Sequence, residues 1–310
     1  MVDGILNINK PAGRTSFSLV AMVKRLSGEP RVGHAGTLDP AATGVLPVCL
    51  GQGTRVVEFL VDATKSYRAE VELGVATDTY DGAGQIIQRG DYSAISYEQV
   101  AAALTSFRGQ IQQTPPMYSA VKYRGQPLYK LARAGVTVER KSRPARIYDL
   151  DIIEWQPPLL TIEVVCGKGT YIRSLAHDLG QALGCGAYLK SLVRLRCGVF
   201  DIGDAVSVPQ LEDAFRYGYW QRFLYPIDTV LGHWSAMVVS DDAGQSLRLG
   251  RPLALENGDG GEEGIHLAPL PSSVTSSADC CRAYALDGRF LGVLRFNAVR
   301  RQWQPEKVFF

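Results

Sequence analysis

One acidic side chain lies in an unusually constrained turn, within the segment HAGTLDPAATGVLP at residues 34–47. Asp39 precedes Pro40, whose ring fixes a backbone angle suited to the first turn of a helix, and Gly36 can adopt angles closed to other residues. An aspartate here can be a helix N-cap, since its carboxylate can accept hydrogen bonds from exposed backbone amides. It can also be a catalytic carboxylate, and these residues alone leave both interpretations open.

Two further side chains are candidates for a site with Asp39. Tyr67 lies on the apolar face of an alternating segment, where packing in the core is the simpler interpretation. Arg173 lies in the first turns of an expected helix, where a cation opposes the helix dipole. A nearby carboxylate would explain its position, although a surface arginine at the start of a helix is also ordinary.

Positive charge is concentrated in the middle of the chain, although the net charge is only +2. Residues 101–200 carry 14 basic and 6 acidic side chains, whereas the segments on either side are net negative. Basic residues interleaved with tyrosines suit a surface that neutralises phosphates and stacks on bases, and a solvated basic face is the alternative. The residues concerned are Lys122, Arg124, Lys130, Arg133, Arg140, Lys141, Arg143, Arg146, Tyr118, Tyr123, Tyr129 and Tyr148.

Several familiar signatures are absent from the sequence. Gly51 and Gly53 lack the third glycine of a dinucleotide loop, and Gly167–Thr170 lacks the spacing of a Walker loop. Four histidines without short spacing, and six cysteines without a CxxC pair, argue against a zinc site. We expect reduced, buried thiols, no cofactor and no metal. This narrows any reaction to one that protein side chains perform alone.

Length and composition indicate an ordinary globular protein with room for two domains. The chain has 310 residues, of which 46% are hydrophobic and 21% charged. No apolar run reaches the roughly 20 residues that span a bilayer, and the first residues lack the pattern of a signal peptide. We therefore expect a cytoplasmic protein with no membrane contact. Without a heptad pattern or an obvious apolar interface, we expect a monomer with no obligatory protein partner.

Apolar periodicity predicts strands and helices that alternate over the first 200 residues. The expected strands are 4–10, 65–73, 146–155 and 159–166, and the expected helices are 16–26, 96–107 and 172–183. Residues 108–145 are basic, rich in glycine and proline and expected to be irregular, which is typical of functional or disordered segments. Beyond residue 235 a short helix at 240–249, strands at 282–286 and 290–296, and a Gly-, Glu- and Ser-rich insertion at 256–279 indicate a small, mostly β domain.

Six long and unusual strings show that the chain resembles the TruB family of tRNA pseudouridine synthases. They are GILNINKPAGRTSF at 4–17, residues 33–47, KSY at 65–67, QTPPMYSAVKYRGQPLYKLARAG at 113–135, GTYIRSLAHDLG at 169–180 and residues 192–198. The resemblance implies an α+β pseudouridine synthase fold over 1–234, with a mixed, largely antiparallel sheet flanked by helices and loops. Residues 235–310 are similar to the family's RNA-binding PUA domain, from which the insertion departs.

The resemblance also implies an activity, the isomerisation of uridine to pseudouridine at position 55 in the T arm of tRNA. The reaction cuts the bond between uracil and ribose, rotates the base and rejoins it through a ring carbon, without a cofactor. Asp39 is implied to attack the sugar or to initiate a glycal route. Arg173 is implied to pair with it and hold its pKa below the usual range, and Tyr67 to stack on the base and help take a proton.

The implied substrate is a uridine that is flipped out of the folded arm. His34 is implied to fill the vacated space, Leu192 to close the apolar side of the pocket, and the basic segment 108–145 to clamp the arm. The implied substrate-binding residues are His34, Lys10, Leu192, Lys65, Lys122, Tyr123, Arg124, Lys130, Arg133 and Arg143. Phosphate contacts of this kind predict that tRNA binding falls steeply with salt.

Two other functions are compatible with parts of the sequence. One is a non-catalytic RNA-binding protein, a tRNA-folding factor, on the same scaffold, and this role can coexist with catalysis. The other is a different RNA modifier such as a methyltransferase, which would require a cofactor loop that the sequence lacks.

Overall fold

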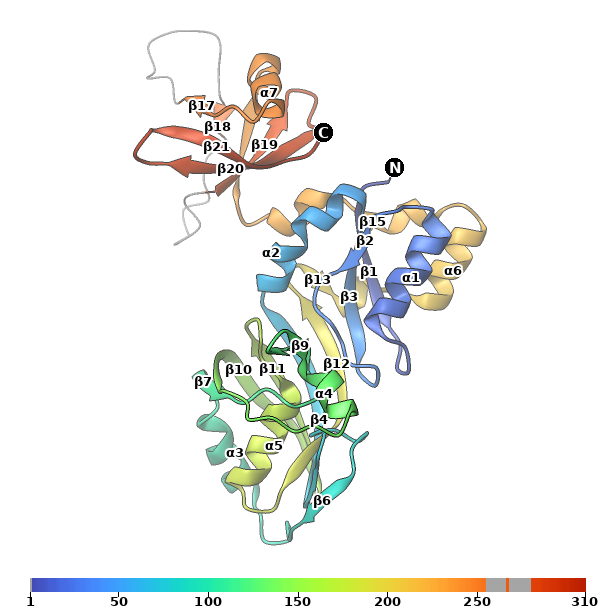
Figure 1. Cartoon of the computed structure of the whole chain (residues 1–310), viewed down its shortest axis with the longest axis vertical. Helices are drawn as coiled ribbons and strands as arrows, with labels where there is room; N and C mark the ends of the chain where they lie inside the picture. The colour runs from blue at the N-terminus through green and yellow to red at the C-terminus, as the bar shows by residue number, and fades with distance from the viewer. Residues whose placement is uncertain (1, 255–265, 268–279) are drawn as a thin grey trace.

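A computed structural model of the chain describes residues 2–254, 266–267 and 280–310. An 11-stranded sheet forms the body of the protein, and a 6-stranded sheet forms a smaller C-terminal unit that follows it in the chain (Figure 1). The insertion predicted at 256–279 lies outside the described residues, apart from 266–267.

The large sheet is mixed and mainly antiparallel. Within the part of the chain that the structure describes, only the β1–β14 and β12–β3 pairs of this sheet run parallel. Its main path is β14 (Val206–Ser207), β1 (Gly4–Lys10), β3 (Thr43–Leu50), β12 (Ala187–Cys197), β4 (Lys65–Leu73), β11 (Leu159–Cys166), β10 (Arg143–Gln156) and β7 (Gly109–Gln113). The short strands β2 (Val32–His34), β13 (Phe200–Asp201) and β15 (Leu224–Tyr225) pair off this path.

Two long central strands join the halves of the sheet. β12 pairs with β4 from Ala187 to Cys197, but it pairs with β3 only at Val193 and Arg194. In Figure 1 β4 and β12 run from the half that contains β1, β3 and α1 into the half that contains β10, β11 and α5. Val193 and Arg194 of β12 therefore lie between the start of β3 and residues 67–68 of β4.

Helices cover the sheet through separate apolar clusters. α3 (Tyr97–Thr105) and α5 (Ile172–Ala182) pack on the side chains that β4, β10 and β11 bury, while α1 (Ser16–Ser27) and α6 (Val208–Arg216) pack on β1 and β3. The capping box expected at the start of α3 is present, with Ser96 and Gln99 bonded reciprocally. Gly184, with φ 74°, follows the end of α5 as predicted.

The prediction that residues 108–145 are irregular is wrong in part. This range contains β7, β8 (Lys122–Tyr123), β9 (Gln126–Pro127), α4 (Leu128–Arg133) and the first residues of β10. β7 is an edge strand with little burial, so its sequence lacks the apolar alternation that identifies half-buried strands. The other elements are too short for periodicity to reveal.

The C-terminal unit packs on one end of the body. Its sheet contains β16 (Ser235–Val239), β17 (Leu253–Ala254), β18 (His266–Leu267), β19 (Cys280–Ala285), β20 (Phe290–Asn297) and β21 (Gln302–Val308), and α7 (Asp241–Arg248) lies beside it. Lys307 Nζ lies 2.6 Å from Glu58 Oε1 on α2 (Val57–Asp62), and Phe309 is buried in a cluster with Val56 and Leu60. These contacts attach the unit to the half of the body that carries β1 and β3.

The six cysteines are buried and stand outside any disulfide, which confirms the prediction of buried, reduced thiols. Among the residues that the structure describes, no helix is long and apolar enough to cross a membrane.

Candidate active site

The segment that carries Asp39 connects β2 to β3, and its backbone is fixed by hydrogen bonds to two neighbouring side chains. The buried ammonium of Lys10 donates hydrogen bonds to the carbonyls of Pro40 at 3.1 Å and Ala42 at 2.6 Å. The hydroxyl of Ser16 accepts from the amide of Leu38 at 3.0 Å. The chain bends after Asp39 and enters β3 at Thr43, so no helix begins here and the N-cap interpretation is wrong. The valine-rich run after the turn pairs in the sheet instead.

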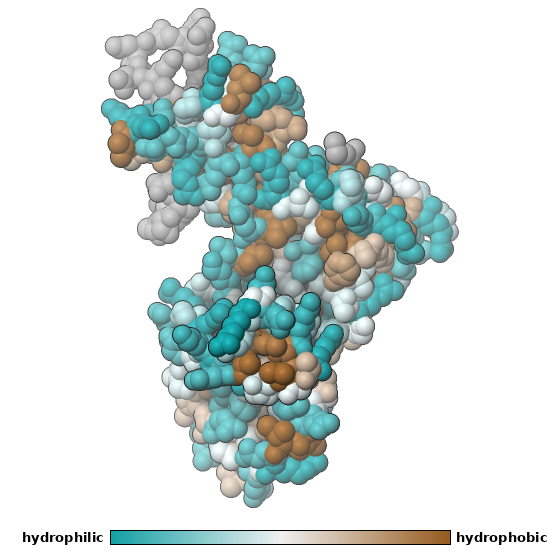
Figure 2. All heavy atoms as spheres, viewed as in Figure 1, coloured by the Kyte–Doolittle hydropathy of each residue, from teal (hydrophilic) through white to brown (hydrophobic). Residues whose placement is uncertain are grey.

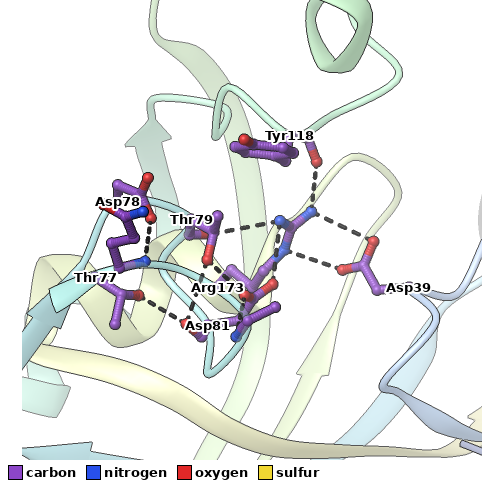
Figure 3. A network of polar contacts seen from close by, with 9 residues as sticks. Asp39, Thr77, Asp78, Thr79, Asp81, Tyr118 and Arg173 are labelled. Carbon is purple, nitrogen blue, oxygen red and sulfur yellow. Dashed lines mark hydrogen bonds and ion pairs between the residues drawn. The ribbon is translucent and has the colours of Figure 1, made fainter. Parts of the chain in front are cut away.

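Arg173 meets Asp39 across the junction of the two halves (Figure 3). Its Nε lies 3.0 Å from Asp39 Oδ2, and its Nη2 donates to Asp39 Oδ1 at 3.4 Å. The arginine side chain is 7% exposed and that of the aspartate 42% exposed. A planar guanidinium with two donors on one carboxylate sets both the charge and the orientation of that carboxylate. The position of Arg173 against the helix dipole is therefore explained by an acid.

A second aspartate, which the sequence analysis missed, contacts the same guanidinium. Asp81 Oδ2 lies 3.4 Å from Arg173 Nη1, and Thr79 donates its hydroxyl proton to Asp81 Oδ1 at 2.6 Å. The carbonyl of Tyr118 accepts from Arg173 Nη2 at 2.8 Å. Figure 3 shows Arg173 between Asp39 on one side and the loop of Thr79 and Asp81 on the other. The Asp-Gly pair at 81–82 signals a turn, and nothing in that signal indicates a functional carboxylate.

Tyr67 lies on β4, which β12 separates from β3 and the Asp39 segment. It pairs with Arg194 of β12 and Val164 of β11 in the sheet, and its ring packs at the edge of the apolar cluster under α3 and α5. Burial raises the pKa of Tyr67 to about 12, against the opposing effect of the nearby Arg194 charge. The phenol is therefore protonated at neutral pH.

The pKa of Asp39 is raised above its usual value. Desolvation by the surrounding protein is the largest cause; the charges of Arg173 and Lys10 oppose it, and that of Asp81 adds to it. The prediction that Arg173 holds this pKa below the usual range is therefore wrong in its net direction. The sequence shows an opposite charge but not the burial that outweighs it.

Two lysines expected at the substrate have other partners in the structure. Lys10 is fully buried beneath the Asp39 turn, and burial lowers its pKa to about 8 although Asp39 opposes this shift. Lys65 is buried, and its ammonium donates to the carbonyls of Leu60 and Ala63 at the end of α2. Neither ammonium is directed at solvent, so we assign both residues a structural role, in which they bond backbone carbonyls.

His34 and Leu192 lie close to the central strands. His34 ends β2 and is half-buried, and the described part of the chain offers its buried Nδ1 no hydrogen-bond partner. Burial, together with the charge of Arg194, lowers the pKa of His34, so its ring is mainly neutral at pH 7. Leu192 pairs with Ala69 in the sheet and packs against the cluster that contains Tyr67.

The remaining predicted contacts lie on the surface rather than in the site. Over the part of the face where Figure 1 places α4 and β9, Figure 2 shows hydrophilic side chains around an apolar patch. Arg124 lies over the ring of Tyr123 and Arg133 over that of Tyr129, at 5.4 and 5.6 Å from the ring centroids. All the cations expected here are exposed, namely Lys122, Arg124, Lys130, Arg133 and Arg143.

Across the residues that the structure describes, no three His, Cys, Asp or Glu side chains are grouped as a metal site would require. The groups that converge on Arg173 are the carboxylates of Asp39 and Asp81 and backbone carbonyls. Their chemistry is that of a positioned carboxylate.

Solved structures share this fold. The structure "Crystal Structure of a Cbf5-Nop10-Gar1 Complex" has a chain that superposes with a TM-score of 0.74 at 27% identity, covering 99% of this chain and 85% of the other. A chain in "Structure of H/ACA RNP bound to a substrate RNA containing 2'-deoxyuridine" superposes with a TM-score of 0.73 at 25% identity, over 99% and 85%. The predicted α+β pseudouridine synthase fold is confirmed.

Sequence comparison assigns the chain to one family of pseudouridine synthases. The model described as TruB family pseudouridylate synthase (N terminal domain) matches residues 24–172, and that of the tRNA pseudouridylate synthase B C-terminal domain matches residues 173–232. A tRNA pseudouridine synthase B of Dehalococcoides mccartyi is 48% identical over 99% of this chain and 97% of its own length. One of Symbiobacterium thermophilum is 50% identical over 68% and 71%.

The chain belongs to the TruB family of pseudouridylate synthases. This confirms the predicted resemblance and the predicted class of enzyme, a tRNA pseudouridine synthase. Residues 233–310 lie outside both family models, so the PUA-like character of the C-terminal unit stays a prediction.

Proposed function

We propose that this enzyme isomerises uridine 55 in the T arm of tRNA, with Asp39 as the catalytic carboxylate. The observation that carries the proposal is the paired contact of Arg173 with Asp39 at the junction of the two halves. Membership of the TruB family supports the tRNA substrate. The position within tRNA comes from the resemblance alone.

Asp39 starts the reaction in this proposal, either by attack on the ribose carbon or by promoting a glycal route. In both routes the bond between N1 of uracil and the ribose breaks, and its electron pair leaves with the base. The base rotates and C5 bonds to the ribose carbon, which in the first route displaces the Asp39 carboxylate and in the glycal route is accompanied by return of the proton taken from C2′. The proton on C5 is then lost and N1 gains a proton. Arg173 fixes the orientation of the carboxylate, so that its reactive oxygen already faces the sugar when the substrate binds.

Tyr67 is proposed to stack on the uracil ring. A phenol with a pKa of about 12 is a weak base at neutral pH, which favours stacking over removal of the C5 proton. The aromatic ring at the edge of an apolar cluster is suited to holding a flat base. Leu192, which packs against the same cluster, is proposed to close the apolar side of the pocket.

The RNA must present the uridine outside its stack, at a cost of a few kcal/mol. His34 is proposed to occupy the space that the nucleotide leaves, since it is half-buried, mainly neutral and next to the catalytic segment. The exposed cations of residues 108–145 are proposed to contact the phosphates of the arm. The C-terminal unit is proposed to be a second RNA contact, and the enzyme to act as a monomer.

A tRNA-folding factor on this scaffold is the second candidate function. Such a factor needs basic and aromatic surface, but it does not need a partly buried aspartate held by a buried guanidinium. That pair costs desolvation free energy which RNA binding alone does not require. The site therefore favours the enzyme as the principal activity.

Mass mapping of pseudouridine tests the proposal. An unmodified tRNA transcript is incubated with the pure protein and no cofactor, beside a transcript that carries cytidine at position 55. We expect one pseudouridine, at position 55, in the first transcript and none in the second. Pseudouridine at another site with uridine 55 unchanged would contradict the position, and none in either transcript would contradict the activity.

A further inference from the structure

A second arginine near the site is buried without an acidic partner. Arg194 on β12 is 1% exposed and is among the largest fully buried side chains. None of the ion pairs formed by the described residues includes it. A buried charge is costly unless its donors are satisfied, so the contacts of this guanidinium need an explanation.

The guanidinium of Arg194 donates to both ends of the segment that carries Asp39. Its Nε donates to the carbonyl of Val45 at 2.5 Å, and its Nη1 and Nη2 donate to the carbonyl of Gly36 at 3.3 and 3.2 Å. One of these carbonyls precedes Asp39 and the other follows it. The arginine thus joins the two ends of the catalytic segment across its base.

Arg194 also lies between the Asp39 segment and Tyr67 in the sheet. It is paired with Gly44 of β3 and with Tyr67 of β4, and its charge acts on the Tyr67 phenol to oppose the rise in the pKa of that group. Arg194 is therefore in contact with the segment of Asp39 and with the tyrosine proposed to stack on the base. Arg173, in contrast, contacts Asp39 and the Asp81 loop.

Two glycines allow the catalytic segment to lie directly on Arg194. A Cβ on Gly44 would come within 2.2 Å of the Arg194 carbonyl oxygen, and one on Gly36 within 3.3 Å of Nη1. Both glycines have positive φ, 101° and 82°. The close approach of this segment to Arg194 thus depends on the backbone conformation and not only on the rotamer of the arginine.

We infer that Arg194 is a positioning residue, which fixes the Asp39 segment relative to Tyr67: its rigid guanidinium bonds the carbonyls of Gly36 and Val45, and its backbone is paired with Tyr67 in the sheet. It touches neither the sugar nor the base. Lysine cannot replace it, because a single ammonium lacks the fork that spans both carbonyls. The inference rests on the proposed function, since its effect is on the geometry of that reaction.

Single-turnover rates on a T-arm stem-loop, measured for Arg194→Lys and Arg194→Met, test this role. Misplacement of reacting groups by about 1 Å can cost on the order of 10²-fold in rate, and we expect about that loss for the lysine variant and more for methionine. The dissociation constant for the stem-loop should stay within about threefold of wild type, because no RNA contact is removed. Arg196→Lys, at an exposed site on the same strand, is the matched control and should keep the wild-type rate.

A coupling measurement separates positioning from general stability. In Tyr67→Ala the ring that Arg194 positions is absent, so adding Arg194→Lys should cost less than it does in wild type, whereas a general loss of stability would add in full. A wild-type rate in a folded Arg194→Lys protein would overturn the inference, as would full additivity. Failure of both Arg194 variants to fold would assign the residue to stability and also overturn it. An inactive wild-type protein would instead contradict the proposed function.

Discussion

The Asp39 centre and the basic segment at 108–145 are built in opposite ways. At the centre Lys10, Arg173 and Arg194 are buried, and each is bonded to several carbonyls or carboxylates. On the segment Lys122 and Arg124 are exposed, and the recorded contact of the Arg124 guanidinium is with the ring of Tyr123. The side chains of the first region are held in place before RNA binds. Those of the second region are charged and exposed, so they can adjust to the RNA.

This difference predicts which measurement each region controls. Groups fixed in advance contribute to the rate, because their orientation cost is met during folding. Exposed cations contribute to affinity and to its dependence on salt, because they replace the counterions of phosphates. Substitutions in the two regions should therefore change different constants.

The largest effect is expected for Asp39→Asn. The amide has the shape of the carboxylate but neither its charge nor its nucleophilicity, so single-turnover pseudouridine formation should fall by more than about 10³-fold. The dissociation constant for the T-arm stem-loop should change little. Asp62→Asn, at an exposed acid on α2 that pairs with Lys168, is the matched control and should keep full activity. Measurable turnover by Asp39→Asn would remove this residue from the chemistry.

A smaller effect, with a diagnostic pH dependence, is expected for Asp81→Asn. Asp81 is a partner of Arg173, and loss of a contact that supports a catalytic group typically lowers activity about tenfold or more. We therefore expect the rate of this variant to fall about tenfold. The Asp81 charge raises the pKa of Asp39, so its removal should lower that pKa. In the proposed mechanism Asp39 reacts as the ionised carboxylate, so the acid limb of kcat/KM should then move to lower pH.

Asp78→Asn is the matched control for this shift. Asp78 belongs to the same loop, where its Oδ1 accepts from the Gln85 amide at 2.8 Å, and the contacts that Arg173 makes with described residues do not include it. This variant should keep the wild-type acid limb. An equal shift in both variants would attribute the effect to the loop and not to the Asp81 charge.

Much of the fold was predictable because its central elements have strong local signals. The alternation at 65–73 and the strings at 4–10 and 159–166 match β4, β1 and β11 to the residue. The edge strand β7 has no such alternation, because it buries little on either face. Its position depends on pairing with β10, which a local pattern does not record.

In the candidate site, too, some features could be predicted from local sequence and others depend on contacts made in the folded chain. The resemblance brought Asp39 and Arg173 to attention, and the structure places them in contact. Asp81 and Arg194 were missed because their roles depend on which groups surround them, and burial also reversed the expected shift in the pKa of Asp39. Contacts between distant segments and the loss of solvent are properties of the folded chain, so single-sequence patterns identify residue types but not these effects.

The smallest effect on rate is expected in the basic segment. Lys122→Ala combined with Arg124→Ala removes two exposed cations, so T-arm binding should weaken about three- to tenfold near 0.1 M salt, and the slope of log K against log salt should become shallower by about 1 to 2. The single-turnover rate at saturating RNA should stay within about twofold of wild type. The matched control, Arg89→Ala with Arg216→Ala, removes two exposed cations outside this segment and should leave both affinity and slope unchanged. A fall in the saturated rate with unchanged affinity would place these cations with the preformed centre, and the distinction between the two regions would then fail.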